Sequence, residues 1–596
     1  MPIRALAQSA LAATICAVSL APPGAIAQET APSARSEDAR FAALSKRWLD
    51  GVMRENPVWA TRLGDHRFDG ELDDLSAAGR HRRLTFNEQV LRELEAIDSS
   101  KLTRENQVDA AILRNELRGT IWDIATDASW AWNPLDYSDL AGGAIYGLVT
   151  RDYAPWSERL VAVASRMEKI PALLAQARRN LDLARVPKIH AETLAKQNAG
   201  LASLVDEFVV PQRDQLSGGD LVRLDDAIAG LRKAVDEHQQ WIENVLVPNA
   251  QGDFRIGREK YDQKLAFALD SPLGRDEIRR RAESEIVRVR GRMYQIARTL
   301  LRKQGAPTLP DSPSESQQQE AIEAALELAY VDHPKREDLV DAARQALADA
   351  TRFALEKDLV SLPGDPVKVI LMPEFQRGVA GAYCDSPGPL DRGQPTYFAL
   401  SPIPDSWSAE QTESFLREYN TRMLHLLSIH EAMPGHYLEG AHSNQHPSVL
   451  RAVLRSGVFA EGWAVYTENM MADAGYLDGD PLFRLVQLKF YLRSVANALL
   501  DQGVHVGGWT RDHAMDLMVR QTFQQEREAA GKWVRAQLTA TQLPTYFVGA
   551  QEQFDLRKAV EEREGATFSL KRYHDAVLSY GAPPVRYVHE LMLLER

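Results

Sequence analysis

The chain has 596 residues, of which 44% are hydrophobic, and a formal net charge of −13 at pH 7. This charge argues against binding to nucleic acid or to an anionic membrane surface, because both carry charge of the same sign. The length allows one large core or two. Beyond the N-terminus no apolar run approaches the roughly 18 residues that a spanning helix needs. We therefore expect a soluble globular protein without an integral membrane segment, whose oligomeric state the sequence does not define.

The N-terminal residues have the three parts of a secretory signal peptide. Arg4 precedes an apolar run from Ala10 to Ala21, and the small-residue pattern Ala25-Ile26-Ala27 follows it. The run is shorter than a spanning helix of about 18 to 20 residues, which disfavours an uncleaved membrane anchor. We predict cleavage after Ala27, removal of residues 1–27, and a secreted or periplasmic location.

Cysteine usage sharpens this prediction. Cys16 is a candidate lipidation site, but Ile15 is unfavourable directly before a lipidated cysteine and apolar residues follow it, so soluble export is favoured. Removal of the signal peptide leaves Cys384 as the only cysteine. The mature chain then has no internal disulfide, and its stability must come from packing.

Residues 28–360 are predicted to form a helical N-terminal region. Apolar residues recur at intervals of three and four, with charged residues between them, in stretches such as Ser157 to Asp182 and Gly219 to Val247. This spacing is typical of amphipathic helices. No repeat of fixed period is visible, so we expect a non-repetitive array of helices.

A change of pattern near Val367 predicts a small β element. The segments Val367 to Met372 and Thr396 to Leu400 are rich in β-branched, aromatic and other apolar residues, and a stretch rich in Gly and Pro separates them. The strand Thr396 to Leu400 is a candidate for pairing with an extended peptide at a sheet edge. Helical patterns then resume as far as the C-terminus.

Two histidines six residues apart, His430 and His436, carry the strongest chemical signal. Ser408 and Gln411 form a candidate capping box for a long helix that leads to His430. On a regular helix two metal ligands are normally four residues apart, which places both on one face. At about 100° per residue, a separation of six turns His436 roughly 120° away from that face.

Pro434 and Gly435 resolve this spacing problem. Pro ends or kinks a helix and Gly permits unusual dihedrals, so the chain can swing His436 back toward His430. Glu431, which follows His430 directly, is then placed like the glutamate that reaches a metal-bound water in two-histidine motifs. The alternative is a pair of ordinary polar residues at a helix end, since such a motif arises by chance in roughly a few chains per hundred.

Glu461, 25 residues after His436 on a second predicted helix, is the candidate third ligand. Glu468 lies seven residues further on and shares its helical face with small and apolar residues, so both carboxylates are expected to face another helix. A buried carboxylate needs a partner, which a metal ion or a metal-bound histidine supplies. The alternative is pairing with lysine or arginine side chains.

Two motifs in this region resemble the bacterial family named domain of unknown function 885. Its hallmarks are His-Glu-x-x-Pro-Gly-His, complete here from His430 to His436, and Glu-Gly-Trp-Ala-x-Tyr-x-Glu, complete from Glu461 to Glu468. The similarity covers most of the mature chain. It includes these further segments: Asn56-Pro57, Leu63-Gly64, Asp501-Gln502-Gly503-Val504-His505, Gly508-Trp509 and Tyr573-His574-Asp575.

The resemblance implies a mainly α, zincin-like helical metallopeptidase with a small β element beside the active-site helix. It assigns one zinc ion to His430, His436 and Glu461. Glu431 is then the general base, and Glu468 orients a ligand without binding the metal.

Tyr546 and His505 are candidate donors to the oxyanion that forms during peptide hydrolysis, and Tyr546 is the better of the two. Family members have an Arg followed by Pro-Gly-Gln and a Tyr in this region. Arg535 and Tyr546 match that pattern, whereas Leu543-Pro544-Thr545 departs from it, which weakens any role for the backbone at this turn. The alternative for Tyr546 and His505 is an ordinary core or surface position.

Four arginines near these segments are candidates to hold a substrate carboxylate with both guanidinium nitrogens, as an exopeptidase acting from the C-terminus requires. Most of them are expected to make structural ion pairs instead. They are Arg377, Arg392, Arg493 and Arg535.

These features predict a secreted zinc metallopeptidase that hydrolyses short peptides, with a metal-binding catalytic region at residues 361–596 packed against residues 28–360. Two alternatives remain open: a non-catalytic helical binding protein with a residual metal site, and a metal-dependent amidohydrolase that acts on non-standard peptides. Structural zinc sites usually have four protein ligands and are rich in cysteine. The three ligands and adjacent glutamate nominated here favour the enzyme.

Overall fold

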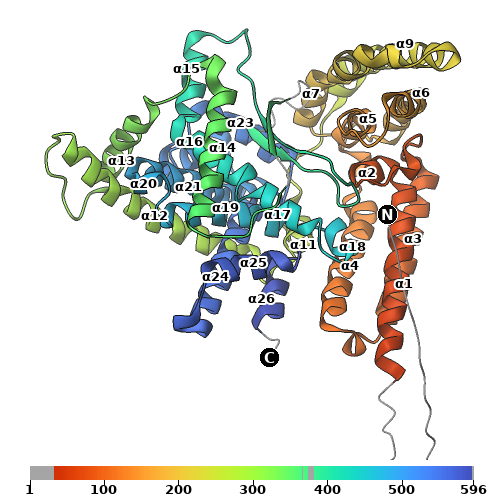
Figure 1. Ribbon diagram of the computed structural model, residues 1–596. Helices are drawn as coiled ribbons and strands as arrows, with labels where there is room; N and C mark the ends of the chain where they lie inside the picture. Colours follow the sequence, from red (N-terminus) through yellow and green to blue (C-terminus); the bar gives the residue numbers. More distant parts are fainter. Residues whose placement is uncertain (1–31, 365–366, 373–380, 594–596) are drawn as a thin grey trace, which may run out of the picture.

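The computed structural model describes residues 32–364, 367–372 and 381–593 (Figure 1). The chain is mainly α-helical with one small three-stranded mixed sheet, which confirms the predicted fold class at this level. The predicted signal peptide lies outside the described residues, as does Arg377. Within the described ranges, no helix combines the length and apolar character needed to cross a bilayer.

The first helices form a body of their own at the N-terminal end. In Figure 1, α1, α3 and α4 lie side by side, and α6 packs between α5 and α9. An apolar core of side chains from residues 137–250 holds the second group together. The helices are α1 Pro32–Glu55, α2 Pro57–Arg62, α3 Ala77–Glu95, α4 Arg104–Trp122, α5 Leu135–Val149, α6 Trp156–Asn180, α7 Lys188–Gln197, α8 Gly200–Leu204 and α9 Gly218–Trp241.

Most of the remaining helices build the larger part of the molecule, whereas the first of them, Val247–Asn249, packs against α7. They are α10 Val247–Asn249, α11 Gly257–Leu269, α12 Arg275–Lys303, α13 Glu315–Tyr330, α14 Leu339–Glu356, α15 Ala409–Glu418, α16 Thr421–Leu427, α17 His436–Ser443, α18 Val449–Val453, α19 Gly457–Asp473, α20 Tyr476–Gly479, α21 Pro481–His505, α22 Arg511–Met515, α23 Glu526–Leu538, α24 Pro544–Glu564, α25 Leu570–Ser579 and α26 Val585–Leu593. The two helical stretches predicted from periodicity correspond to α6 and to α9, which a π-helical turn at Ile242–Leu246 continues.

The sheet has the strand order β1-β3-β2, with β1 at Val367–Leu371, β2 at Ala382–Asp385 and β3 at Thr396–Leu400. Strand β3 pairs in parallel with β1 and antiparallel with β2. The prediction of β1 and β3 is confirmed, but the suggestion that β3 offers an edge is wrong, because both of its sides are paired. In the described chain, β1 and β2 are the outer strands of the sheet: β1 packs against α14, and β2 is a short strand within the stretch rich in Gly and Pro.

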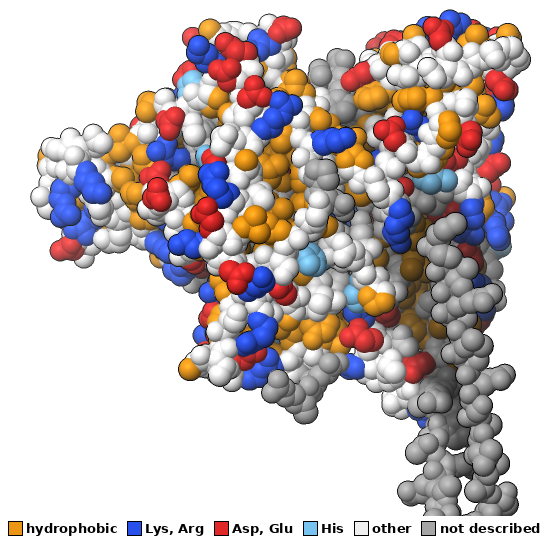
Figure 2. All heavy atoms as spheres, viewed as in Figure 1, with side chains coloured by type: hydrophobic (Ala, Val, Ile, Leu, Met, Phe, Trp, Pro, Cys, Tyr) orange, Lys and Arg blue, Asp and Glu red, His pale blue; other side chains and the backbone are white. Residues whose placement is uncertain are grey.

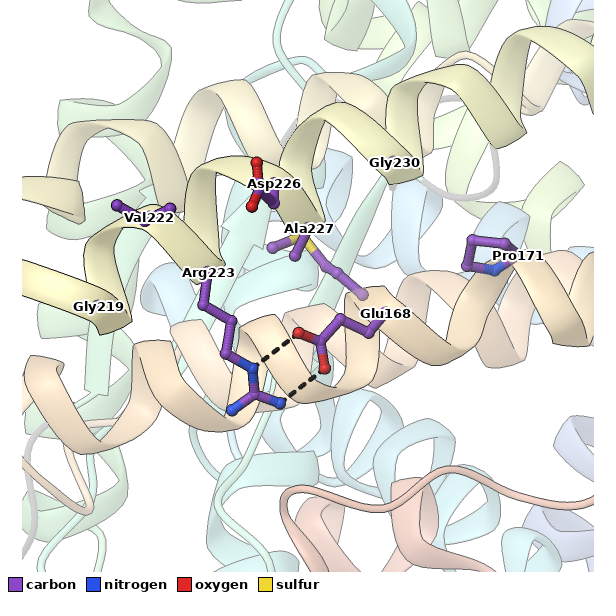
Figure 3. A pocket seen from close by; sticks show the side chains of 9 residues that line it. Glu168, Pro171, Gly219, Val222, Arg223, Asp226, Ala227 and Gly230 are labelled. Carbon is purple, nitrogen blue, oxygen red and sulfur yellow. Dashed lines mark hydrogen bonds and ion pairs between the residues drawn. The ribbon is translucent and has the colours of Figure 1, made fainter.

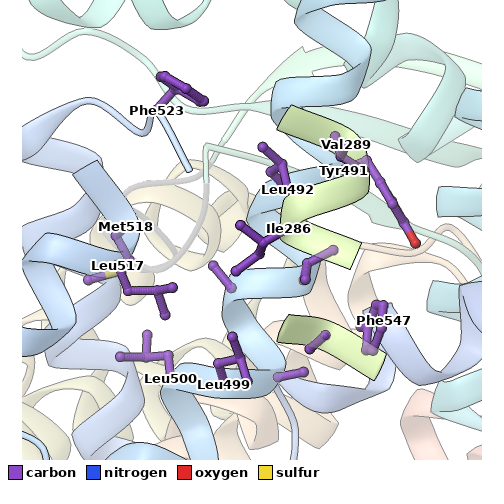
Figure 4. Close-up of a cluster of buried hydrophobic side chains, with 14 of the residues drawn as sticks. Ile286, Val289, Tyr491, Leu492, Leu499, Leu500, Leu517, Met518, Phe523 and Phe547 are labelled. Carbon is purple, nitrogen blue, oxygen red and sulfur yellow. The ribbon is translucent and has the colours of Figure 1, made fainter. Parts of the chain in front are cut away.

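Two apolar cores tie the early helices to the late ones. In Figure 4, Ile286 and Val289 of α12 pack against Leu492 of α21 and near Phe547 of α24. A second core joins side chains of α14 to the sheet and to α16, α19 and α25. Both cores contain residues from each side of position 360, so segments before and after it pack together. The division into two regions stays a prediction.

A polar cluster around His66 joins the first helices to the loop before β3. The His66 ring stacks on Tyr153 with ring centroids 3.5 Å apart. Its Nδ1 lies 2.9 Å from Asp69 Oδ2 and its Nε2 lies 3.5 Å from Asp391 Oδ1. Burial alone would lower the pKa of His66, but the two aspartates outweigh it and raise this pKa to about 9. The protonated form of His66 therefore stabilises the contact between the first helices and this loop.

The surface offers two features that bear on function only indirectly. In Figure 2, acidic and basic side chains are interspersed over the visible face. Figure 3 shows a recess between α6 and α9, which Glu168 and Arg223 bridge through a bidentate ion pair with distances of 2.7 and 2.6 Å. Its lining belongs to the N-terminal body alone.

Candidate metal centre

The segment that leads to His430 is two helices, where a single long helix was predicted. The capping box of Ser408 and Gln411 is present and begins α15. The helix ends at Tyr419, whose φ of −94° and ψ of 43° are not helical, and the Asn420 side chain accepts a hydrogen bond from Met423 N to begin α16. An Asn that caps the backbone in this way competes with helix continuation.

His430 and Glu431 lie in a π-helical turn, Ser428–Ala432, that follows α16 directly. The chain then turns through Pro434 and Gly435 into α17, which begins at His436. A Cβ atom on Gly435 would lie 2.0 Å from His430 O, so only glycine allows the backbone to pass this closely. Trp463 Nε1 donates to Pro434 O at 2.9 Å and holds the turn against α19.

This turn places His436 beside His430, with ring centroids 4.8 Å apart and ring planes nearly perpendicular. Glu461 of α19 faces both rings: its Oε2 lies 3.7 Å from His430 Nε2 and 3.3 Å from His436 Nε2. One possible ligand atom from each of the three residues lies within 4.8 Å of the others. The three side chains nominated from the sequence therefore converge on a single point.

Glu468, two turns after Glu461 on α19, lies behind His430. The His430 Nδ1 and Glu468 Oε1 atoms are 2.6 Å apart, and the Glu468 side chain is fully buried. A proton on Nδ1 that is donated to this carboxylate leaves the Nε2 lone pair directed toward Glu461. This is the tautomer that a metal ligand requires, and a carboxylate partner of this kind also fixes the ring orientation.

The electrostatics of the cluster favour a cation. Burial alone would lower the pKa of His430, but the carboxylates of Glu461 and Glu468 reverse the effect and raise it well above its usual value. Burial alone would raise the pKa of Glu461, yet the two imidazoles lower it strongly. The charged forms of His430 and Glu461 thus stabilise each other, whereas burial raises the pKa of Glu468. Positive charge between the two carboxylates is favoured.

Comparisons with known proteins identify the family of this chain. A model of the family described as bacterial protein of unknown function, DUF885, matches residues 57–592. The chain belongs to the DUF885 family. No curated protein matches it.

Two solved structures resemble this DUF885 member over nearly its whole length. A candidate lipoprotein of unknown function from Shewanella oneidensis is 35% identical, with a TM-score of 0.78, and the match covers 93% of this chain and 99% of that one. A candidate lipoprotein from Colwellia psychrerythraea is 19% identical, with a TM-score of 0.76 and coverage of 93% and 98%. The second likeness concerns the fold alone.

The crossing of α19 and α24 brings Tyr546 toward the centre. A Cβ atom on Gly462 would lie 2.4 Å from the backbone of Gly549, so the two helices touch at these glycines. Glu461 precedes one glycine, and Tyr546 lies one turn before the other. Tyr546 OH lies 3.4 Å from Arg535 Nη2, which leaves its proton free to point elsewhere. Burial first, and the Glu461 carboxylate second, raise the pKa of this phenol.

His505 lies in a different setting at the end of α21. Its Nε2 is 2.9 Å from both Ala536 O and Thr539 O, and its ring stacks on Tyr261 with centroids 6.1 Å apart. A proton on Nε2 is therefore engaged by backbone carbonyls. These contacts give His505 a role in joining α21 to α23 and separate it from the three converging ligands.

Other DUF885 motif residues support the site from behind. Tyr466 donates to His574 Nε2 at 2.6 Å, and His574 Nδ1 donates to Leu359 O at 2.7 Å. Burial lowers the pKa of His574 to about 4, which keeps it neutral and able to accept from Tyr466. Asp575 accepts from the Ser361 backbone and hydroxyl at 2.7 and 2.8 Å. These residues hold α19 and α25 in place.

Three residues near the centre escaped the sequence reasoning. Phe490 of α21 meets the His430 ring edge to face, with centroids 5.9 Å apart. Cys384 lies on β2, which packs against the π-helical turn, and its thiol is close enough to sense the charge of Glu431. Lys532 of α23 is buried among charged neighbours. Only the helical spacing between Phe490 and Arg493 gave a usable signal in the sequence.

Proposed function

We propose that this protein is a zinc-dependent metallopeptidase with a zincin-like active site. The observation that carries the proposal is the convergence of His430, His436 and Glu461 with Glu468 behind the first histidine. A structural zinc site is usually closed by four protein ligands, whereas a catalytic site has three and an open position. The donor set here is two imidazoles and one carboxylate, which suits zinc.

Two observations on Glu461 bear on whether the residues fit a divalent ion. Glu461 Oε2 faces both Nε2 atoms but makes no hydrogen bond of proper geometry within the described residues. The Glu461 and His436 side chains retain 20% and 14% exposure, although the Oε2 atom that faces the imidazoles is itself buried. Zinc in such a site supplies a Lewis acid and lowers the pKa of a water to about 7.

The protein side of the proposed reaction rests on two groups. Glu431 follows His430 in the same turn and is placed to accept a proton at its carboxylate and return it to the leaving amine. We assign donation to the oxyanion to the Tyr546 hydroxyl, which accepts a hydrogen bond from Arg535; the electrostatic influence of Glu461 on this phenol supports the assignment. His505 is not assigned this role, because its Nε2 faces backbone carbonyls.

A peptide substrate is supported by the sheet. In the described chain, one edge of β2 is unpaired, and β2 packs against the turn that carries His430 and Glu431. Extended peptides bind such edges through main-chain hydrogen bonds. A peptide paired with β2 would pass the metal centre in an extended conformation.

We also propose that the mature protein works in the cell envelope or outside the cell. The predicted cleavage after Ala27 supports export, and the relative of solved structure that is 35% identical is described as a candidate lipoprotein. For this chain, soluble export remains favoured over lipidation at Cys16, since Ile15 precedes that cysteine. Mass spectrometry of the mature N-terminus distinguishes the two.

The decisive experiment measures metal content and peptide cleavage together. We expect the purified mature protein to hold one zinc ion and to cleave a mixed peptide library. The Glu431→Gln variant should keep the zinc and lose at least about a hundredfold in turnover, since general base catalysis contributes roughly that much. Glu410→Gln, an exposed change on the neighbouring α15, serves as the matched control.

The outcomes separate the competing functions. A parent without bound metal, or a fully active Glu431→Gln variant, would overturn the proposal. Metal binding without cleavage of any peptide favours the binding protein. Cleavage confined to non-standard amides favours the amidohydrolase.

A further inference from the structure

A chain of contacts leads from the metal centre along α21 to Arg493. Phe490 packs against the His430 ring, and the Arg493 guanidinium lies 5.4 Å from the Phe490 ring centroid, one helical turn further on. Arg493 Nη2 is paired with Glu528 Oε1 at 2.5 Å, yet its side chain retains 20% exposure. A partly exposed guanidinium therefore lies one helical turn from Phe490, the residue that contacts the His430 ring.

Two further cations, Lys532 and Arg535, lie one turn apart on α23 and join Arg493 at this place. Arg535 reaches Tyr546 OH at 3.4 Å and Gln542 Oε1 at 2.8 Å. Lys532 is only 5% exposed, and in the described part of the chain its amino group has no carboxylate within ion-pair distance. A buried cation without such a partner is costly, and it points to a ligand that completes the site.

The local charge balance is positive. Glu528 is the carboxylate paired with Arg493, and the nearby Glu418 is engaged by Lys489 at 2.7 Å. Burial first, and then the neighbouring Arg493 and Arg535, lower the pKa of Lys532 well below its usual value, although Glu528 and Glu418 oppose this. The charged form of Lys532 is therefore disfavoured until an anion binds beside it. An anion placed among these three cations would relieve that repulsion.

The cation group also lies at one end of the free sheet edge. Tyr419 lies close enough to Arg493 for the guanidinium to favour its ionised form, and a Cβ atom on Gly381, the residue before β2, would lie 1.7 Å from Tyr419 OH. Cys384, three residues further along, is near Glu431. At about 3.3 Å per residue, roughly 10 Å of strand separates the catalytic end from the cation end.

Building on the proposed peptidase function, we propose that Arg493, Lys532 and Arg535 form a subsite for a substrate carboxylate, namely that of the peptide's C-terminus. A peptide running antiparallel to β2 would place its C-terminal end beside Gly381 and Arg493. The scissile bond would then lie near Glu431, and fragments of about one to three residues would be released from carboxyl ends. An Asp or Glu side chain offers the same chemistry, and the test distinguishes the two.

The experiment compares three versions of one peptide that the parent enzyme cleaves: the free acid, the C-terminal amide, and an amide with Glu as its last residue. We expect kcat/KM for the free acid to exceed that for the plain amide by roughly ten- to a hundredfold, as charge-assisted hydrogen bonds allow. The Glu amide should resemble the plain amide.

Variants of the subsite should reduce this preference. Lys532→Met removes the cation while keeping its bulk, and the ratio of free-acid to amide kcat/KM should fall about tenfold. Arg535→Gln should lower the same ratio. An indirect effect of this change on Tyr546 would slow cleavage of the acid and the amide alike, so it cancels in the ratio. Lys558→Met changes an exposed lysine of α24, whose side chain is 75% accessible, and should leave the ratio unchanged.

Equal cleavage of acid and amide would overturn the subsite while leaving the peptidase intact. A preference for the Glu amide would assign the subsite to a side chain and overturn terminal recognition. An acid preference that survives both Lys532→Met and Arg535→Gln would show that other groups bind the carboxylate. Failure to bind zinc or to cleave any of the peptides would instead overturn the proposed function itself.

Discussion

Replacing Glu468 tests the electrostatic support of the metal centre without touching a ligand. Its Oε1 lies 2.6 Å from His430 Nδ1 in a fully buried setting. Loss of such an outer partner typically weakens metal binding by 10- to 100-fold, or about 1.4 to 2.7 kcal/mol. Glu468→Gln keeps a carbonyl oxygen that can accept a hydrogen bond from His430 Nδ1, so its metal affinity should fall about tenfold. Glu468→Leu removes the acceptor and should approach a hundredfold.

Zinc affinity is measured by competition with a chromogenic chelator, starting from metal-free protein. Thermal unfolding of each variant checks that the fold is retained, and Glu410→Gln is the control for loss of one negative charge. The reasoning predicts the order parent, Gln variant, Leu variant, from tightest to weakest. Unchanged affinity in both variants, or tighter binding by Glu468→Leu, would refute the claim that this carboxylate orients His430.

Two further predictions concern stability. Gly462→Ala puts a methyl group 2.4 Å from the Gly549 backbone and should cost about 1–3 kcal/mol in urea unfolding, whereas Gly457→Ala on the same helix meets open space and should stay within about 0.5 kcal/mol. Similar losses in the two would contradict the helix contact. His66 has its pKa raised from 6.5 to about 9, so its stabilising contribution is full below pH 6.5 and is lost as the pH rises through 9. In His66→Gln the free energy of unfolding should depend less on pH between 6.5 and 9. An unchanged dependence on pH would count against a stabilising role of the His66 cluster.

Much of the centre was readable from the sequence, because its residues lie in two short motifs whose spacing encodes local geometry. Pro434 and Gly435 explained how a six-residue gap converges, and the structure adds the close passage of Gly435 under His430 O. The seven-residue spacing of Glu461 and Glu468 placed both on one face of a helix, as found in α19.

Other features depend on tertiary packing that no local pattern encodes. The apolar periodicity continues across Asn420, so the sequence predicted one helix where the structure has two. An Asn side chain ends one helix and caps the next only when its hydrogen-bond geometry is satisfied, which the periodicity does not report. Strand β2 has only four residues, and its pairing with β3 stabilises its extended conformation. Lys532 resembled any lysine of an amphipathic helix, and its burial arises from the placement of α23 beside α21.

The two cores that cross position 360 indicate which span of the chain must be kept together to support the metal centre. Side chains of α12 and α14 complete the apolar surroundings of α16, α19 and α21, the helices that carry or support the metal-binding turn. A gene fragment beginning after residue 360 would encode every proposed ligand but leave those helices without much of their packing. The DUF885 match accordingly extends over residues 57–592 as one block. Recombination, truncation or fusion should preserve that whole span, because the chemistry is concentrated in a few residues but the support for it is distributed.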